Sequence, residues 1–440
     1  MNIHAHIDSV KKAGMLAQNT FRGTHSSSLA ASSQTSTSYT AIKVHNAFST
    51  TNGSPHNTQN YSYFFSNSLA KTRRARRRKK AFLARASSSG TENKTLEWFN
   101  FGPRGTMLQQ TFADGPPLHV STPLIYSQPL SERNERTTYI KMDNCQPSGS
   151  FKLRGLGYAC QKALVLDGKK SFVSSSGGNA GLAVAYSGYR LGAKTTVVVP
   201  ETTPAFIRDR LESYKAKVIV HGKQWSEANG LAEKIALEED AFFAHPFEGE
   251  DTWTGHATIV HEMCAQLRDA GETVPPSFIC TCVGGGGLLL GIAQGLREVG
   301  WAKTDVLVSE TVGCDSLFQS VQKNELVTLP AITSVAKSLG AAQVSPTAFD
   351  LTQQWKREGK SPRVTSTTVT DDQALDACKN FANHHRALVE PACGACLALS
   401  YEGRVRDATN DTNDAGCVVV QVCGGAITDL SAFSSSSSSS

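Results

Sequence analysis

Short apolar runs of strand length alternate with longer apolar segments of helical period between residues 170 and 200. "KSFVSSS" (170–176) predicts a short buried strand, and "NAGLAVAYSGYRLG" (179–192) predicts an alanine-rich helix that ends at Gly192. "KTTVVVP" (194–200) predicts the next strand, which the proline terminates. Together these three elements form one βαβ unit.

A second unit of the same kind follows further along the chain. "SFICTCV" (277–283) predicts a strand, "LLLGIAQGLREVG" (288–300) a helix and "DVLVSE" (305–310) another strand. Two further strands are expected in "KAKVIVHG" (215–222) and "GCVVVQVCGG" (416–425). This alternation predicts an α/β fold whose mostly parallel sheets are covered by helices on both faces.

The two ends of the chain lack these periodicities. Residues 1–95 form a basic, Ser/Thr-rich stretch that we expect to be disordered, and "KTRRARRRKK" (71–80) lies within it. Its Arg- and Ser-rich, acid-poor composition is typical of an organelle transit peptide, which would direct the protein to mitochondria or plastids. A nuclear-localisation or RNA-contacting tail, or upstream sequence absent from a cytoplasmic protein, is the alternative. Residues 434–440 are a poly-serine tail.

The net positive charge of the chain comes from its N-terminal residues. Residues 1–90 hold 13 Lys/Arg and one acid, Asp8, which gives +12. Of the 44 Lys/Arg and 38 Asp/Glu in the whole chain, 44 − 13 = 31 and 38 − 1 = 37 remain, so residues 91–440 carry −6. We therefore expect no nucleic-acid binding by the folded body. Because no run reaches about 18 apolar residues, no membrane span is predicted.

The 11 cysteines are odd in number and irregularly spaced, which argues against a disulfide framework and favours a reducing compartment. "CGAC" (393–396) has the C-x-x-C spacing, but no second pair stands at zinc-finger spacing. His119, His245 and His256 also lack a second ligand three or four residues on. We therefore expect no metal site of Cys and His, and we assign these histidines to packing and hydrogen bonding.

Two strand-to-helix junctions carry residues suited to anions. "VGGGGLLLG" (283–291) lets the backbone approach a ligand and aims helix N–H groups at a phosphate. A dinucleotide fingerprint is a weaker alternative, because Leu289 or Leu290 stands where its third glycine belongs. "SSSGGNAG" (174–181) offers hydroxyl, amide and backbone donors to a carboxylate, or a helix start with Asn179 near the N-cap.

A lysine, Lys152, follows a Ser-Gly-Ser turn in "PSGSFKLRG" (147–155). On its own it is most simply a solvated amine. Combined with the two anion-ready junctions, it indicates a phosphorylated cofactor and a carboxylate substrate that meet at an amine. Pyridoxal phosphate (PLP) fits this combination, since it requires a phosphate site, a lysine and a partner for its pyridine nitrogen.

The chain from 117 to 430 closely resembles the catabolic L-serine/L-threonine dehydratases (ammonia-lyases), a PLP-dependent family of the tryptophan-synthase-β-like fold type II. The resemblance runs in order through "PLHVSTPL" (117–124), "KMDNCQPSGSFKLRG" (141–155), "SSSGGNAG", "VVVPETTPA" (197–205), "HPFEGEDTWTGHATIVHE" (245–262), "VGGGGLLLG", "LPAITSVAKSLG" (329–340), "LVEPACGACLALSY" (388–401) and "VVVQVCGG" (418–425). It implies a two-domain, three-layer αβα fold with mostly parallel twisted sheets. Residues 117–153 plus 249–433 would form the large PLP-binding domain, and 154–248 the small domain that binds the substrate carboxylate.

The resemblance also implies residue roles. Lys152 would form the Schiff base with PLP and then act as the catalytic base, while Phe151 and Ser338 would lie against the two faces of the ring. Three further cofactor contacts are implied: the ring hydroxyl with Asn179, the phosphate with Gly284, Gly285, Gly286, Gly287 and Leu288, and the pyridine nitrogen with Cys423. The substrate carboxylate would be lined by Ser176, Gly177, Gly178, Asn179 and Ala180. A monovalent cation such as K⁺ would be held near Gly284, Glu310, Cys314, Ser316, Leu339 and Ala341.

The implied activity is deamination of L-serine to pyruvate and of L-threonine to 2-oxobutanoate, by a homodimer as in the family. Serine racemase, biosynthetic threonine dehydratase, threonine synthase and a PLP-binding protein without turnover are the alternatives. The sequence departs from the family pattern at Gly177, where some members carry alanine, and at 426–429, where Ala-Ile-Thr-Asp replaces the usual Ser-Asn-Ile-Ser. Glu390 is given no role.

Overall fold

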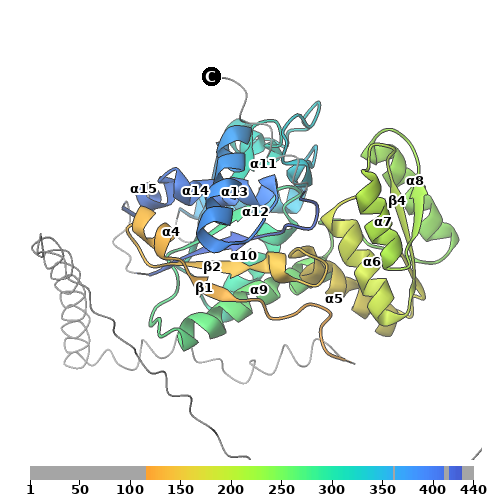
Figure 1. The fold of residues 1–440 in the computed structure, drawn as a ribbon, viewed down its shortest axis with the longest axis horizontal. Helices are drawn as coiled ribbons and strands as arrows, with labels where there is room; N and C mark the ends of the chain where they lie inside the picture. The colour runs from red at the N-terminus through yellow and green to blue at the C-terminus, as the bar shows by residue number, and fades with distance from the viewer. Residues whose placement is uncertain (1–114, 360–361, 411–415, 429–440) are drawn as a thin grey trace, which may run out of the picture. The chain divides into compact units, whose positions relative to one another are not determined.

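The structure, a computed structural model, describes residues 115–428 except 360–361 and 411–415. The predicted extension (1–95) and the poly-serine tail (434–440) lie outside the described residues. Within them, the strands form two separate sheets, one of six strands and one of four. Figure 1 shows the helices packed around both sheets, with the four-stranded sheet beside α6, α7 and α8 on the right of the view.

The larger sheet has the strand order β1-β2-β10-β7-β8-β9. Its strands are β1 (Leu124–Tyr126), β2 (Thr138–Met142), β7 (Phe278–Cys282), β8 (Asp305–Thr311), β9 (Val364–Val369) and β10 (Val418–Val422). β1 pairs antiparallel with β2, and the remaining neighbours pair parallel. The predicted second βαβ unit is therefore confirmed, with its strands β7 and β8 side by side.

Helices cover both faces of this sheet because its strands are apolar on both faces. Val418, Val420 and Val422 of β10 pack in the core cluster that contains α13 and α14, and Val419 packs in the cluster that contains α9 and α10. Successive strand residues point to opposite faces, so an uninterrupted valine run needs two apolar layers. The helices of this part are α4 (Gln128–Arg133), η2 (Asp143–Cys145), α9 (Glu250–Asp269), α10 (Gly287–Val299), α11 (Ser316–Lys323), η3 (Lys337–Leu339), α12 (Pro346–Glu358), α13 (Asp371–His385), α14 (Pro391–Tyr401) and α15 (Arg404–Asn410).

The smaller sheet has the strand order β5-β4-β3-β6, and all its pairs are parallel. Val197 and Val199 of β4 pack towards α6 and α7, whereas Val198 packs towards α8. The strands are β3 (Ser171–Ser174), β4 (Lys194–Val199), β5 (Lys217–Val220) and β6 (Phe242–Phe243), and the helices are α5 (Lys152–Val165), α6 (Asn179–Leu191), α7 (Ala205–Ser213) and α8 (Trp225–Glu238). α6 ends at Gly192, whose φ of 69° is left-handed, as predicted.

Both sheets fit the predicted αβα layering, which is confirmed. The strands of the smaller sheet all fall within the predicted small domain, 154–248, and the other strands fall outside it. The exact domain bounds stay a prediction. No helix of the described residues is long and apolar enough to cross a membrane.

Strand order determines where the predicted site residues meet. β2, β10 and β7 are neighbours, and the segments that follow their carboxyl ends carry Lys152, Cys423 and the glycine run respectively. In parallel sheets, ligands bind at this carboxyl edge. Three motifs far apart in the sequence therefore lie together.

Candidate active site

Backbone hydrogen bonds join the Ser-Gly-Ser turn before Lys152 to the residues that directly follow β10. Gly149 has a φ of 87°, a left-handed conformation that favours glycine. A Cβ there would also lie 2.7 Å from the Cβ of Ala426, so both the backbone and the neighbouring side chain require glycine. The N–H of Phe151 donates to the carbonyl of Cys423 at 2.9 Å, and the N–H of Gly425 donates to Gly149 at 3.1 Å. The turn thus fixes the start of α5, and with it Lys152, beside Cys423.

The amine of Lys152 lies in a half-buried position at the first residue of α5. Its Nζ donates to the carbonyl oxygen of Pro246 at 2.5 Å and lies 5.2 Å from the centre of the Phe151 ring. Burial lowers the pKa of Lys152 to about 8, although the nearby Cys282, Cys423 and Glu390 favour the charged form. A lysine with this pKa can lose its proton near neutral pH and act as a nucleophile or base.

The glycine run is packed against protein as well as open to a ligand. A Cβ on Gly285 would lie 2.2 Å from the ring of Phe247, and one on Gly287 would lie 2.6 Å from the Phe247 carbonyl oxygen. Gly286 has a φ of 93° and forms the N-cap of α10. Because Phe247 follows Pro246, the same segment contacts both Lys152 and this loop.

The start of α10 has the chemistry of an anion site. The first N–H groups of a helix lack partners within the helix, and the helix dipole adds partial positive charge there. Gly287 and Leu288 are the first two residues of α10, and Gly284 and Gly285 remain partly exposed just before it. The run from Gly284 to Leu288 can therefore present backbone donors to a phosphate.

Hydrogen bonds to the carboxylate of Glu390 connect the part of the chain around the smaller sheet with the part around the larger sheet. Asn179 comes from the first part, and Ser338 and Glu390 come from the second. The Nδ2 of Asn179 donates to Oε1 and Oε2 of Glu390 at 2.8 and 3.1 Å, and the Ser338 hydroxyl donates to Oε1 at 3.0 Å. Gly178 is the N-cap of α6 and Asn179 its first residue, so the predicted helix start with Asn179 near the N-cap is confirmed. The Oδ1 of Asn179 is buried and has no hydrogen-bond partner in the described structure.

Glu390 is a functional candidate to which sequence reasoning gave no role. Its side chain is almost fully buried, with 2% of the residue exposed, and burial raises the pKa of its carboxyl. The signal available in the sequence was its place inside a motif of the resemblance, "LVEPACGACLALSY". Nothing local could indicate a partner, because Asn179 lies 211 residues away.

The loop between β3 and α6 lies next to Asn179. Ser176, Gly177 and Gly178 are partly exposed, and the N–H of Gly178 donates to the Ser176 hydroxyl at 3.2 Å. A Cβ on Gly177 would lie 2.5 Å from Oγ1 of Thr203, so an alanine here requires the threonine to move. Ala180 is buried in α6 behind this loop.

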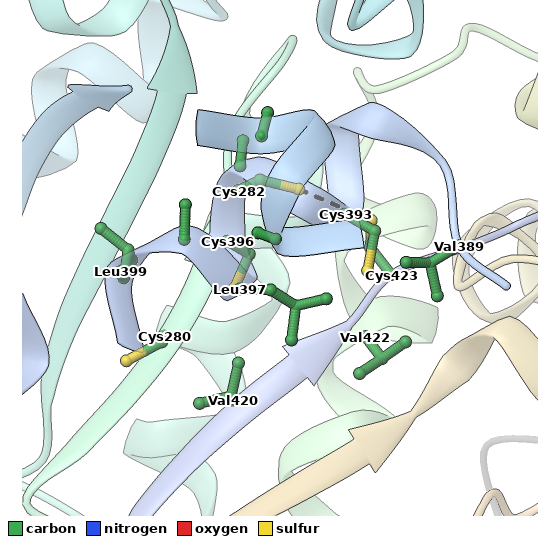
Figure 2. Close-up of a cluster of buried hydrophobic side chains, with 14 of the residues drawn as sticks. Cys280, Cys282, Val389, Cys393, Cys396, Leu397, Leu399, Val420, Val422 and Cys423 are labelled. Carbon is green, nitrogen blue, oxygen red and sulfur yellow. Dashed lines mark hydrogen bonds between the residues drawn. The ribbon is translucent and has the colours of Figure 1, made fainter. Parts of the chain in front are cut away.

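Cys423 lies in a cluster of thiols beneath the carboxyl ends of β7 and β10. Figure 2 shows the side chains of Cys282, Cys423 and Cys393, the last of which belongs to α14, close together, and the sulfurs of Cys282 and Cys423 are 3.6 Å apart. Hydrogen bonds with Cys282 and Cys393, together with burial, raise the pKa of Cys423 well above its usual value. The thiol therefore stays protonated at neutral pH.

The other cysteines and the histidines show no metal chemistry in the described part of the chain. All 11 cysteines lie there as free thiols, and no group of His, Cys, Asp and Glu residues within it could hold a metal ion. The Nδ1 of His245 accepts the N–H of Glu248 at 2.9 Å, and the ring of His256 lies 5.1 Å from that of Phe151. The Nε2 of His119 lies 3.9 Å from Oε1 of Glu262, and burial lowers the pKa of this histidine to about 4.

The residues predicted to surround a cation come from neighbouring segments. A Cβ on Gly284 would lie 3.2 Å from Cα of Leu339, and the N–H of Ala341 donates to Leu339 at 2.7 Å. The backbone of Cys314 forms an isolated antiparallel β-bridge with Thr311, and its side chain packs in the same core cluster as Leu339. Glu310 is buried and accepts the N–H groups of Leu317 and Phe318 at 2.9 and 2.7 Å; Ser316 begins α11 just before them.

The family model of pyridoxal-phosphate dependent enzymes matches residues 117–424, a range that includes all of these site residues. The chain belongs to this family. A human protein named "Serine dehydratase-like" is 42% identical over 316 residues, which cover 70% of this chain and 91% of that protein. The human "L-serine dehydratase/L-threonine deaminase" is 41% identical over 315 residues, with 71% and 92% coverage.

A solved structure agrees with the fold. The crystal structure of a fungal L-serine ammonia-lyase from Rhizomucor miehei superposes with a TM-score of 0.66 at 35% identity. The match covers 72% of this chain and 97% of that protein. The predicted family, the predicted α/β fold class and the predicted PLP cofactor are therefore confirmed.

The side chains of the site fit PLP. The site combines an amine whose pKa is lowered, an aromatic ring beside it, a helix start whose first N–H groups have no partner within the helix, and a protonated thiol. The buried Oδ1 of Asn179 has no hydrogen-bond partner among the described residues, and a Cβ on Gly285 or Gly287 would intrude on Phe247. Amine, phosphate, ring and pyridine nitrogen each thus have a suitable group.

Proposed function

We propose that this protein is an L-serine/L-threonine ammonia-lyase. It converts L-serine to pyruvate and ammonia, and L-threonine to 2-oxobutanoate and ammonia. The observation that carries the proposal is the amine of Lys152, whose pKa of about 8 suits proton abstraction. It donates to the carbonyl of Pro246, and the next residue, Phe247, packs against the glycine loop. The 41% identity to a human L-serine dehydratase/L-threonine deaminase, over 92% of that protein, supports the choice of reaction.

In this proposal the chain holds PLP through five kinds of contact. Lys152 would bind it covalently, and Phe151 and Ser338 would lie against the two faces of its ring. Asn179 would donate to the ring hydroxyl, Cys423 would face the pyridine nitrogen, and the backbone from 284 to 288 would bind the phosphate. When bound, PLP supplies the electron sink that makes the Cα–H bond of an amino acid acidic.

The substrate carboxylate binds at the start of α6. Ser176, Gly177, Gly178, Asn179 and Ala180 line this position, where the helix dipole favours an anion. Once the substrate amino group has replaced the amine of Lys152 on the cofactor, the neutral amine would take the proton from Cα. The β-hydroxyl would take up one proton and leave as water, and hydrolysis of the resulting enamine would give the 2-oxo acid and ammonia. A protonated Cys423 is a weak hydrogen-bonding partner and leaves the pyridine nitrogen uncharged, which favours prompt elimination over transamination.

A monovalent cation and a second protomer complete the proposal. Burial raises the pKa of Glu310 to about 8, and a cation beside it would stabilise its charged form. K⁺ bound near Glu310 would also stabilise the glycine loop, because Gly284 lies close to Leu339.

Light scattering on the purified protein tests the homodimer, for which we expect twice the chain mass of 47.1 kDa.

Product analysis with L-serine, L-threonine and D-serine, with and without K⁺, tests the function. We expect pyruvate from L-serine, 2-oxobutanoate from L-threonine and a higher rate with K⁺. Conversion of L-serine to D-serine as the main product would instead identify a racemase. Visible absorbance of bound PLP with no turnover of any of the three would identify a binding protein.

A further inference from the structure

Glu390 has no part in the proposed chemistry, yet its carboxylate lies at the centre of the site. Burial raises the pKa of Glu390, while hydrogen bonds from Asn179, Ser338 and the backbone N–H of Ile427 act in the opposite direction. The side chain makes no capping bond to α14, although Glu390 is the N-cap residue of that helix. A buried carboxylate that does not cap its own helix needs another explanation.

The three partners of Glu390 come from three different segments. Asn179 begins α6 beside the smaller sheet, Ser338 lies in η3, and Ile427 follows β10. The N–H of Glu390 itself donates to the carbonyl of Gly424 at 3.2 Å, next to Cys423. The carboxylate of Glu390 is thus hydrogen-bonded to each of the segments that the proposed function places around the cofactor ring.

The carboxylate also determines which way the Asn179 amide faces. An ionised carboxylate only accepts hydrogen bonds, so the NH₂ group of Asn179, not its oxygen, must point towards Glu390. The contacts at 2.8 and 3.1 Å both involve the same nitrogen. The second N–H of this group remains to donate elsewhere, and the ring hydroxyl of PLP is an acceptor for it.

We propose that Glu390 is a positioning residue that holds the Asn179 carboxamide and the Ser338 hydroxyl in the orientation needed to bind the cofactor ring. This inference rests on the proposed cofactor contacts of Asn179 and Ser338. Without the carboxylate, the amide of Asn179 can rotate and present its oxygen to another acceptor. We expect loss of this orientation to weaken PLP binding about tenfold, the effect of one hydrogen bond to a charged group.

PLP titration of the apo-protein, followed by the visible absorbance of lysine-bound cofactor, tests this role. Glu390→Gln keeps the shape but removes the charge and lets the new amide donate to the oxygen of Asn179. Glu402→Gln is the matched control, because Glu402 lies exposed at the other end of α14 and bonds Gln373. We expect about tenfold weaker binding for E390Q and no change for E402Q.

A double-variant cycle separates positioning from general damage. If Glu390 acts in part through Asn179, the loss of PLP affinity caused by E390Q is smaller in the N179A variant than in the wild type. Binding by E390Q within twofold of the wild type, or losses that multiply in the double variant, would overturn the proposal. Should E390Q fail to fold, Glu390→Asp retains the charge with a shorter reach and enters the same cycle.

This test is independent of turnover. Because PLP is titrated without amino acid, a protein that binds it normally but leaves L-serine unchanged refutes the proposed function and not the role of Glu390. The converse also holds, since pyruvate formation together with wild-type PLP affinity in E390Q refutes the role of Glu390 alone.

Discussion

At the scale of single residues, the site depends on groups whose surroundings change their chemistry. The roles of Lys152 and Cys423 were predicted through the combined motifs and the family resemblance, because on their own a lysine after a turn and a cysteine after a valine-rich strand have simpler explanations. Glu390 and Pro246 were not, since their contacts with Asn179 and Lys152 span 211 and 94 residues and leave no local pattern. A single sequence shows which residues carry chemistry better than it shows which ones orient them.

The lowered pKa of Lys152 predicts how cofactor uptake depends on pH. Only the neutral amine attacks the aldehyde of PLP, and burial lowers the pKa of Lys152 to about 8. The rate at which apo-protein takes up PLP should therefore rise as the pH increases through about 8 and then level off. Stopped-flow absorbance measures this rate; one that stays flat up to the ordinary lysine pKa of 10.5 would contradict it.

At the scale of elements, strands and helices with a clear period were predicted closely. The helix expected at 179–192 is Asn179–Leu191, and the strand expected at 194–200 is Lys194–Val199. β6, with two residues, was not predicted, because Phe242 and Phe243 are too short a run to show a period. The need for glycine at Gly285 was predicted for the ligand, whereas the structure adds the ring of Phe247 as a second reason.

Gly285→Ala tests the dual role of the glycine loop. The new Cβ would lie 2.2 Å from the Phe247 ring, so we expect a loss of about 1–3 kcal/mol in the free energy of unfolding and weaker PLP binding. Gly230→Ala is the control, because nothing lies within 4 Å of a Cβ there, in α8. It should stabilise the protein by about 0.5–1 kcal/mol. Equal effects of the two variants in urea denaturation would refute the packing argument.

A buried charge network fixes α5 two residues beyond Lys152. Arg154 donates to Asp143 at 2.8 Å and to Glu262 at 2.7 Å, and these three residues come from α5, η2 and α9. Arg154→Met leaves Asp143 buried without its cationic partner. We expect a loss of about 3–5 kcal/mol in the free energy of unfolding, measured by urea denaturation at neutral pH. A loss below about 1 kcal/mol, typical of a surface pair, would contradict this account.

The same network gives stability a defined pH dependence. Burial favours the neutral form of Glu262, but Arg154 and Lys141 outweigh it and lower the pKa to about 2 from an ordinary value of 4.5. A lowered carboxyl pKa contributes stability that is complete above about 4.5 and is lost as the pH falls towards about 2. Glu262→Gln should therefore flatten the decline in unfolding free energy across this interval. An unchanged slope would show that other carboxylates cause it.

At the scale of the whole molecule, the layered α/β class followed from alternating strands and helices, but the strand order did not. β10 inserts between β2 and β7, although it lies far from both in the chain. This insertion brings Cys423 to Lys152, and it depends on long-range packing of valines that no local pattern specifies. Residues 426–428, the described part of the segment that departs from the family pattern, still pack there: the carbonyl of Ala426 accepts a hydrogen bond from Arg210 at 2.9 Å.

Pyruvate formation from L-serine by the wild type and by Lys152→Ala tests the central claim most directly. Both proteins are loaded with PLP, their folding is checked by circular dichroism, and pyruvate is followed with a coupled dehydrogenase. The account predicts steady pyruvate formation by the wild type. It predicts neither turnover nor visible absorbance of lysine-bound PLP in the folded variant. Deamination of L-serine by that variant at the wild-type rate would contradict it.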